Sequence, residues 1–391
     1  MKNPLARPAL YVLMPVLLLL FSQDAWAQEI TRFSGDSTKF ITELNSVFAP
    51  LVANEGKMSA ALMKAFIQKW NTEKYNPSKK KLIYAIGNQM LKKGLKPFPD
   101  FYNYIKALNV FIDSQQPDER FNEWFIVLKG LQENKNNRYF LQFVEQSIFL
   151  FGENLVYKSQ SAKWKIMTSD YHMKFDSVPV ITFAPSMLVC YANNDSLVIF
   201  NTRGVFYPLT FYWIGKGGKV DWQRAGLDPQ QVYANVKNYQ IQMKYAKVEA
   251  DSVEFYNKKF FAFSLMGKFS DKVLANVTED KAQYPTFSSY DKTIGIKNLF
   301  KNVDYLGGFA MEGAKIIGSG SSTEDARLVF RKNNKEFVRI FSKLFVIRTD
   351  RINSANASIT IYHDNDSIYN PVLTMKYIDE KKELTLTRDE R

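Results

Sequence analysis

Two stretches decide the fold: residues 139–152 read YFLQFVEQSIFLFG, and residues 178–183 read VPVITF. In the first stretch, apolar residues recur every three or four positions, which is the period of an amphipathic helix. In the second, a short β-rich run is bounded by turn-forming residues, which is typical of a strand. The sequence therefore predicts a change from helix to strand just after Gly152.

Upstream of this change, six apolar faces have helical spacing and restart about every 20 residues. They begin at Phe40, Leu62, Leu82, Phe101, Phe121 and Tyr139. Asn76-Pro77 predicts an N-cap followed by the first helical residue, and Gly94 predicts the end of that helix. Two helices then occupy about 40 residues, the size of a helical-hairpin repeat, although the repeats share no residue signature. Residues 37–153 are expected to form a helical bundle or a short α-solenoid.

Downstream, β-rich runs separated by Asn, Asp, Gly and Pro continue to the end of the chain. The tripeptide Asp-Ser-aliphatic recurs four times, and its side chains suit a turn that enters a strand. These tripeptides start at Asp176, Asp195, Asp251 and Asp366. Residues 154–391 are therefore expected to form an elongated β domain, either a β-solenoid or jellyroll-like.

The N-terminus has the three parts of a secretory signal peptide. Lys2 and Arg7 precede an apolar run centred on residues 11–21, and Ala25-Trp26-Ala27 supplies an A-x-A cleavage site. The run is shorter than a membrane span and contains Pro15. We expect cleavage after residue 27, export to the periplasm or cell surface, and no transmembrane segment in the mature chain.

The net charge of +13 suggests anionic partners. In an exported chain these would be lipid headgroups or acidic glycans rather than nucleic acid. The alternative is that the lysines are spread evenly and serve solubility, since only Lys79-Lys80-Lys81 forms a run.

Two resemblances bear on location and fold. Residues 250–256, followed by 260–263 and Gly267, resemble strand units of OstA-like lipopolysaccharide-transport proteins, which implies an open β-jellyroll with an apolar trough for acyl chains. Residues 217–227 and 300–309 are similar to segments of long exported proteins of Bacteroidota, a resemblance that implies export but no activity. Because those proteins continue further, the chain is expected to be a shortened copy.

Catalytic and metal-binding chemistry has little support. The two histidines, His172 and His363, lie far apart in the sequence, and the single cysteine, Cys190, lies in an apolar run, so no metal, cofactor or nucleophilic site is expected. Four carboxylates are candidates for glycoside cleavage by residue type alone, without a pattern that pairs them. These are Asp304, Glu312, Asp350 and Asp364.

One basic, aromatic segment is the candidate binding surface. Lys216 and Lys219 belong to a glycine-rich loop, and Trp213, Trp222 and Arg224 flank it. Aromatic rings beside cations can bind sugars or lipid headgroups, but the same rings also suit the core of a β domain. The expected function is a non-catalytic envelope scaffold or binding protein whose partner is an envelope protein, a lipid or an anionic glycan. The alternative is a polysaccharide-acting β-helix enzyme.

Overall fold

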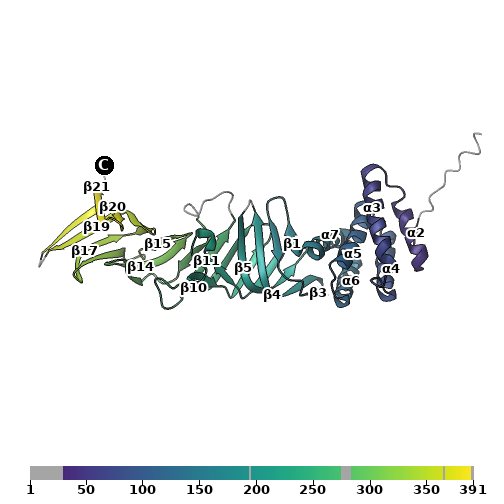
Figure 1. Ribbon diagram of the computed structural model, residues 1–391, viewed down its shortest axis with the longest axis horizontal. Helices are drawn as coiled ribbons and strands as arrows, with labels where there is room; N and C mark the ends of the chain where they lie inside the picture. The colour runs from purple at the N-terminus through teal and green to yellow at the C-terminus, as the bar shows by residue number, and fades with distance from the viewer. Residues whose placement is uncertain (1–29, 193–194, 274–282, 364–365, 389–391) are drawn as a thin grey trace, which may run out of the picture. The chain divides into compact units, whose positions relative to one another are not determined.

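The computed structural model describes residues 30–192, 195–273, 283–363 and 366–388, and these form two compact units that divide between Gln115 and Gln116. The expected signal peptide, residues 1–27, lies outside the described residues. Each unit is described by itself below (Figure 1).

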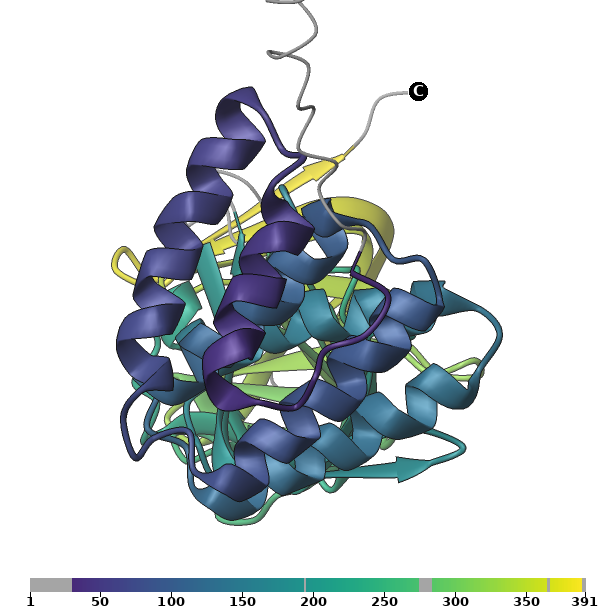
Figure 2. The same cartoon turned by 90° about the vertical axis from the view of Figure 1, so that its right-hand side faces the viewer.

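The first unit is helical (Figure 2). Its elements are α2 (Ser37–Phe48), α3 (Ala53–Trp70), α4 (Pro77–Lys92), the π-helical turn η1 (Pro97–Phe101) and α5 (Tyr102–Asp113). The N-cap of α4 is as predicted, because the Asn76 side chain accepts a hydrogen bond from the Lys79 N–H and Pro77 takes the first helical position. Gly94 follows α4 with a φ of +63°, a conformation that glycine adopts at little cost.

Aromatic side chains form much of the core of this unit. Trp70 is fully buried and stacks on Phe40, with ring centroids 4.9 Å apart, and its Nε1 donates to the Ser37 carbonyl at 3.0 Å. These contacts tie α3 to the start of α2. The high aromatic content of the sequence therefore serves packing here.

The second unit begins with two more helices, α6 (Asp118–Glu133) and α7 (Asn137–Glu153). Helix α6 packs on β3 (Tyr171–Asp176), and α7 packs on α6 and on β1 (Leu155–Lys158). Asn154 ends α7 in the left-handed conformation, so the change from helix to strand falls where the sequence places it. The prediction of a helical part followed by an all-β part is confirmed.

The remaining strands fill the rest of the second unit. They are β2 (Lys163–Ile166), β4 (Val178–Ala192), β5 (Asp195–Tyr207), β6 (Tyr212–Lys216), β7 (Lys219–Asp221), β8 (Val232–Asn235), β9 (Asn238–Gln242), β10 (Lys247–Asn257), β11 (Leu265–Lys272), β12 (Thr286–Ser289), β13 (Ile294–Phe300), β14 (Val303–Glu312), β15 (Lys315–Ser319), β16 (Ala326–Lys332), β17 (Lys335–Ser342), β18 (Leu344–Ile347), β19 (Arg351–His363), β20 (Asp366–Ile378) and β21 (Glu383–Arg388). Every ladder between these described strands is antiparallel.

Long strands change partners along their length. In β14, residues 303–306 pair with β16, whereas residues 308–312 pair with β15. Similarly, β10 pairs with β8 near its end and with β9 near its start. Irregular registers mark such strands, and in β10 the shift lies between Ala250 and Val253, where Ser252 has a φ of +56°. A bulge of this kind bends a strand and increases its twist.

The recurring Asp-Ser-aliphatic tripeptide therefore has two structural settings. At Asp176 it forms the turn from β3 to β4, and at Asp195 and Asp366 it opens β5 and β20, as predicted. At Asp251 the prediction of strand entry is wrong, because this tripeptide lies inside β10 at the bulge. The left-handed residue suits a bulge as well as a turn, so the same residues occur in both.

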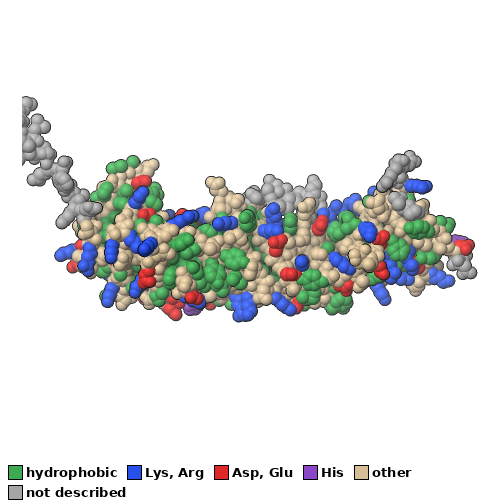
Figure 3. Space-filling model, turned by 180° about the vertical axis from the view of Figure 1, so that it is seen from behind, with side chains coloured by type: hydrophobic (Ala, Val, Ile, Leu, Met, Phe, Trp, Pro, Cys, Tyr) green, Lys and Arg blue, Asp and Glu red, His purple; other side chains and the backbone are tan. Residues whose placement is uncertain are grey.

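Cationic side chains are scattered among acidic ones over the face of the second unit seen in Figure 3, without forming a single large patch there. Among the described residues, no helix is both long enough and apolar enough to cross a bilayer.

Candidate functional site

The two tryptophans of the predicted binding segment are core residues. Trp213 on β6 and Trp222 after β7 are both 0% exposed. The Trp213 Nε1 donates to the Tyr239 hydroxyl at 3.3 Å, and the Trp222 Nε1 donates to the Pro285 carbonyl at 3.1 Å. Both indole N–H groups thus have partners inside the protein, and neither ring is presented to a ligand.

The three cations of that segment are not brought together into one site. Lys216 is exposed at the end of β6. Lys219 donates to the Pro229 carbonyl at 3.1 Å and lies over the Tyr233 ring. Arg224 forms ion pairs with Asp195 at 3.1 Å and with Asp271 at 2.7 Å, so its charge is neutralised within the fold.

Asp271 is the titratable partner in this group. Burial raises its pKa to about 6, while the attraction of Arg224 acts in the opposite direction. Burial raises the pKa of the nearby Cys190 thiol to about 12, and the charges of Asp271 and Arg224 act on it in opposite directions. A thiol with such a pKa is neutral at physiological pH, which agrees with a packing role.

Each described candidate carboxylate has a basic neighbour, and two of them lie far apart. Asp304 pairs with Arg331 at 2.9 Å, Glu312 lies 3.7 Å from Lys315, and Asp350 lies 3.1 Å from Arg351. Asp304 and Glu312 share β14 but are eight residues apart, which is roughly 26 Å of extended strand. Glycosidases need their two carboxyl groups about 5–9.5 Å apart. Asp364 lies outside the described residues.

One cluster of possible metal ligands joins α6 to β3. Oxygen atoms of Glu119 and Glu123 and a nitrogen of His172 lie within 4.8 Å of one another. The buried Arg120 guanidinium also contacts Glu123, and the His172 Nδ1 lies 2.8 Å from Glu123. Burial alone would raise the pKa of Glu123, but hydrogen bonds from His172, the Met173 N–H and Arg120 together lower it.

Because Arg120 already supplies a positive charge there, we interpret the cluster as a tie that holds α6 on the sheet. His363, the second histidine, ends β19 opposite Asp366 in the hairpin register.

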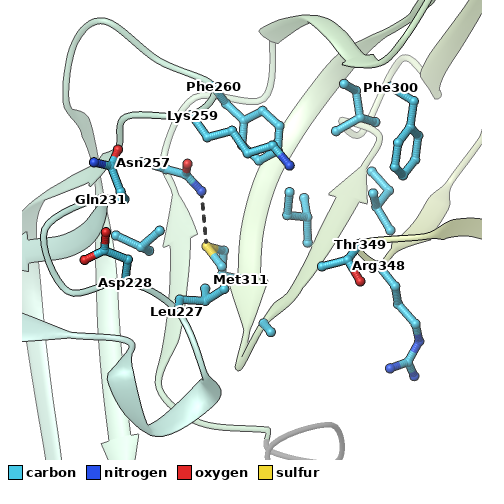
Figure 4. A pocket seen from close by; sticks show the side chains of 15 residues that line it. Leu227, Asp228, Gln231, Asn257, Lys259, Phe260, Phe300, Met311, Arg348 and Thr349 are labelled. Carbon is cyan, nitrogen blue, oxygen red and sulfur yellow. Dashed lines mark hydrogen bonds between the residues drawn. The ribbon is translucent and has the colours of Figure 1, made fainter. Parts of the chain in front are cut away.

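The second unit contains a largely apolar pocket of about 220 Å³ (Figure 4). It is formed where several strands end, by the loop before β8, the end of β10, the hairpins β13–β14 and β14–β15, and the end of β18. Its lining residues are Leu227, Asp228, Gln231, Val232, Asn257, Lys259, Phe260, Leu299, Phe300, Met311, Ala314, Ile316, Ile347, Arg348 and Thr349.

A tight turn forms one wall of the pocket and places only a small side chain there. Glu312 and Lys315 pair across the β14–β15 hairpin, which leaves Gly313 and Ala314 as its two turn residues. Gly313 has a φ of +57°, the conformation that a type II′ turn requires at its first central position. Ala314 then lines the pocket with only a methyl group.

Charged groups lie at the edges of the pocket. Figure 4 shows Lys259 beside Phe260, with the ammonium 5.1 Å from the centroid of the ring. Arg348 points away from the other labelled side chains, and Asp228 lies at the opposite side. The other polar lining residues are Gln231, Thr349 and Asn257, and the Asn257 carboxamide donates from its Nδ2 to the Met311 Sδ.

The pocket was not predicted from the sequence, because its residues come from segments between Leu227 and Thr349 that look like ordinary strand ends. The one available signal was Phe260-Phe261-Ala262-Phe263, quoted above for its resemblance to a lipid-carrying fold, since Phe260 is part of the lining.

The chain is thus a helical and antiparallel β protein whose second unit contains a largely apolar pocket. In comparisons with protein-family models, curated proteins and solved structures, nothing matches it.

Proposed function

We propose that this chain is a non-catalytic binding protein of the bacterial cell envelope whose β-rich unit holds a small ligand with an apolar body. The observation that carries the proposal is the apolar pocket of about 220 Å³ at the strand ends. A protein interior normally fills such space with its own side chains, because a void loses packing contacts. An apolar cavity of about 150 Å³ already binds benzene, so this pocket has room for two fused rings or a short alkyl chain.

The envelope location rests on the signal-peptide pattern of residues 1–27. Periplasmic or cell-surface proteins meet lipids and their breakdown products, which have the apolar bodies that the pocket suits. The pocket is smaller than a trough for whole acyl chains, so the proposal is limited to small apolar ligands or to one segment of a larger one.

Binding of naphthalene, followed by its fluorescence in a titration of the full-length mature chain, tests the proposal. We expect saturable binding with one site per chain. Ala314→Leu should weaken binding at least about tenfold, because its larger side chain occupies the space that the ring needs.

Ala310→Leu is the matched control, since Ala310 lies on β14, four residues before Ala314, but outside the pocket lining. It should bind naphthalene like the wild type. Binding that is absent in the wild type, or unchanged by Ala314→Leu, would remove the proposed function.

A further inference from the structure

Two cations and one carboxylate belong to the pocket lining: Lys259, Arg348 and Asp228. Lys259 is exposed, and its ammonium lies 5.1 Å from the centroid of the Phe260 ring. Among the described residues, no carboxylate forms an ion pair with it. An aromatic ring attracts a cation but leaves its charge uncompensated. Lys259 is therefore available to an anion at the edge of the pocket.

Asp228 has a role in the local turn. Its carboxylate accepts the Gln230 N–H at 2.8 Å, and its backbone carbonyl accepts the N–H groups of Gln231 and Val232 at 3.0 and 2.9 Å. These bonds form the turn that leads into β8, which is a common use of aspartate. Figure 4 shows this carboxylate on the side of the pocket away from the Lys259 ammonium. The turn thus accounts for Asp228, whereas Lys259 has no comparable structural role.

The neutral polar residues of the lining do not select the charge of a ligand. Gln231 and Thr349 are exposed, and each can both donate and accept hydrogen bonds. The buried Asn257 Oδ1 is out of reach of a ligand in the pocket. The sign of the charge around the pocket therefore depends on the three charged residues. Two are positive and one is negative, so a net positive charge remains.

The shape of the site separates an apolar body from a charged group. Figure 4 shows Arg348 pointing away from the other labelled side chains, whereas Lys259 extends beside Phe260 toward Phe300. A charge placed deep among the apolar side chains would lose its hydration at a high cost. At the edge it stays hydrated, and the flexible stem of a lysine lets the ammonium follow it. A ligand with its charge at one end therefore fits best.

We infer that the ligand is a small amphiphilic anion, whose apolar body occupies the pocket and whose anionic head group, such as a carboxylate, pairs with Lys259 at the edge. This inference rests on the proposed function and specifies its ligand class. The apolar lining binds the body, and Lys259 discriminates between ligands by the charge of the head group.

Two ligands with the same two-ring body provide the test: 2-naphthoate, which is an anion, and its neutral methyl ester. Their affinities are measured by fluorescence titration of the full-length mature chain and of Lys259→Met. The ratio of the 2-naphthoate affinity to the ester affinity should fall about fivefold in Lys259→Met, which is the value of one partly exposed ion pair. The ester should bind both proteins equally well.

Lys258→Met is the matched control, because Lys258 is the preceding residue, is exposed and lies outside the lining. It should keep the wild-type ratio. Asp228→Asn should raise the ratio, because it removes a like charge from the lining and keeps a side-chain oxygen that the Gln230 N–H can donate to.

Salt provides a second measurement that needs no variant. Raising the salt concentration from about 20 mM to about 500 mM should weaken binding of 2-naphthoate to the wild type and leave the ester unaffected. A ratio that is unchanged in Lys259→Met, or 2-naphthoate binding that does not respond to salt, overturns the inference while the proposed function stands. If neither these ligands nor naphthalene bind to the wild type, the proposed function itself fails.

Discussion

At the scale of single residues, buried polar groups in the β-rich unit belong to two kinds. The Thr202 hydroxyl, fully buried, lies 2.6 Å from the Tyr239 hydroxyl, which in turn accepts from Trp213. Such a chain of bonds satisfies its members and fixes the packing around them. Asn257 has no comparable partner at its carbonyl oxygen. We therefore assign the first group to stability.

The Arg224–Asp271 pair makes stability depend on pH. The pKa of folded Asp271, about 6, lies above its ordinary value of 3.8, so the folded state binds this proton more tightly than the unfolded state. The contribution of this group is therefore favourable at low pH and is lost as the pH rises through about 6. Above that pH, Arg224 is the group that compensates the buried charge.

Arg224→Met should lower the free energy of unfolding by about 3 kcal/mol at pH 8, because it leaves the Asp271 charge buried and unpaired. At pH 5 the loss should be clearly smaller, because Asp271 can then bind a proton. Urea denaturation at the two pH values measures the difference. Lys237→Met, which removes a more exposed pair with Glu254, should show no such pH dependence. An equal loss for Arg224→Met at both values would contradict the account.

Residue identity alone could not separate core from site in the basic, aromatic segment. Tryptophan is a residue type that sugar- and lipid-binding surfaces use, yet Trp213 and Trp222 are both buried. What decides their place is the register of β6 against β5 and β9, which turns Trp213 inward. Register depends on partners distant in sequence, so local spacing does not reveal it.

At the scale of elements, the contact of α6 with β3 depends on a glycine. A Cβ atom built on Gly130 would lie closer than 3.0 Å to the Phe175 Cδ1 and Cγ, atoms near the base of that ring. On the same helix, Glu123 accepts the Met173 N–H at 2.8 Å. The helix and the strand are thus held together at a short distance by both packing and hydrogen bonds.

Gly130→Ala tests which of two effects is larger. Alanine favours a helix interior by about 1 kcal/mol, but the clash with Phe175 should cost about 1–3 kcal/mol. We expect net destabilisation in urea denaturation. The double variant Gly130→Ala with Phe175→Ala should show less destabilisation than the sum of the two single changes, because the clash is then absent. A stabilised Gly130→Ala would mean that α6 moves away from β3 at little cost.

Elements themselves were largely predictable, because the apolar period changes at Gly152 and the helix caps are local signals. The bulge in β10 was not, since Asp251-Ser252-Val253 resembles the tripeptides that enter other strands. The two settings share a left-handed serine, at Ser177 and Ser252. Only the partner strands distinguish a turn from a bend in a continuing strand.

At the scale of the whole molecule, the pocket arises from topology. Its lining comes from five separate segments between residues 227 and 349, which antiparallel pairing brings together at their ends. None of these segments has a distinctive motif, so the sequence predicts the strands but not the space between them. Long-range pairing, rather than local pattern, creates the candidate site.

The two compact units divide between Gln115 and Gln116, inside the helical part of the chain, so α6 and α7 belong with the strands. Helix α6 packs on β3 and α7 packs on β1, so a cut at the change from helix to strand would expose both sides of these two contacts. The boundary between the two compact units therefore lies before α6, whereas the change from helix to strand lies after α7.

This difference predicts how fragments fold. Residues 116–391 should form a soluble monomer that unfolds cooperatively and binds naphthalene, because every pocket residue lies beyond residue 226. Residues 154–391 should aggregate or unfold at much lower urea concentration, because β1 and β3 lose the helices that pack on them. Size-exclusion chromatography and urea denaturation of both fragments provide the measurement. Equal stability of the two would show that α6 and α7 contribute nothing to the sheet, and the unit would then begin at the strands.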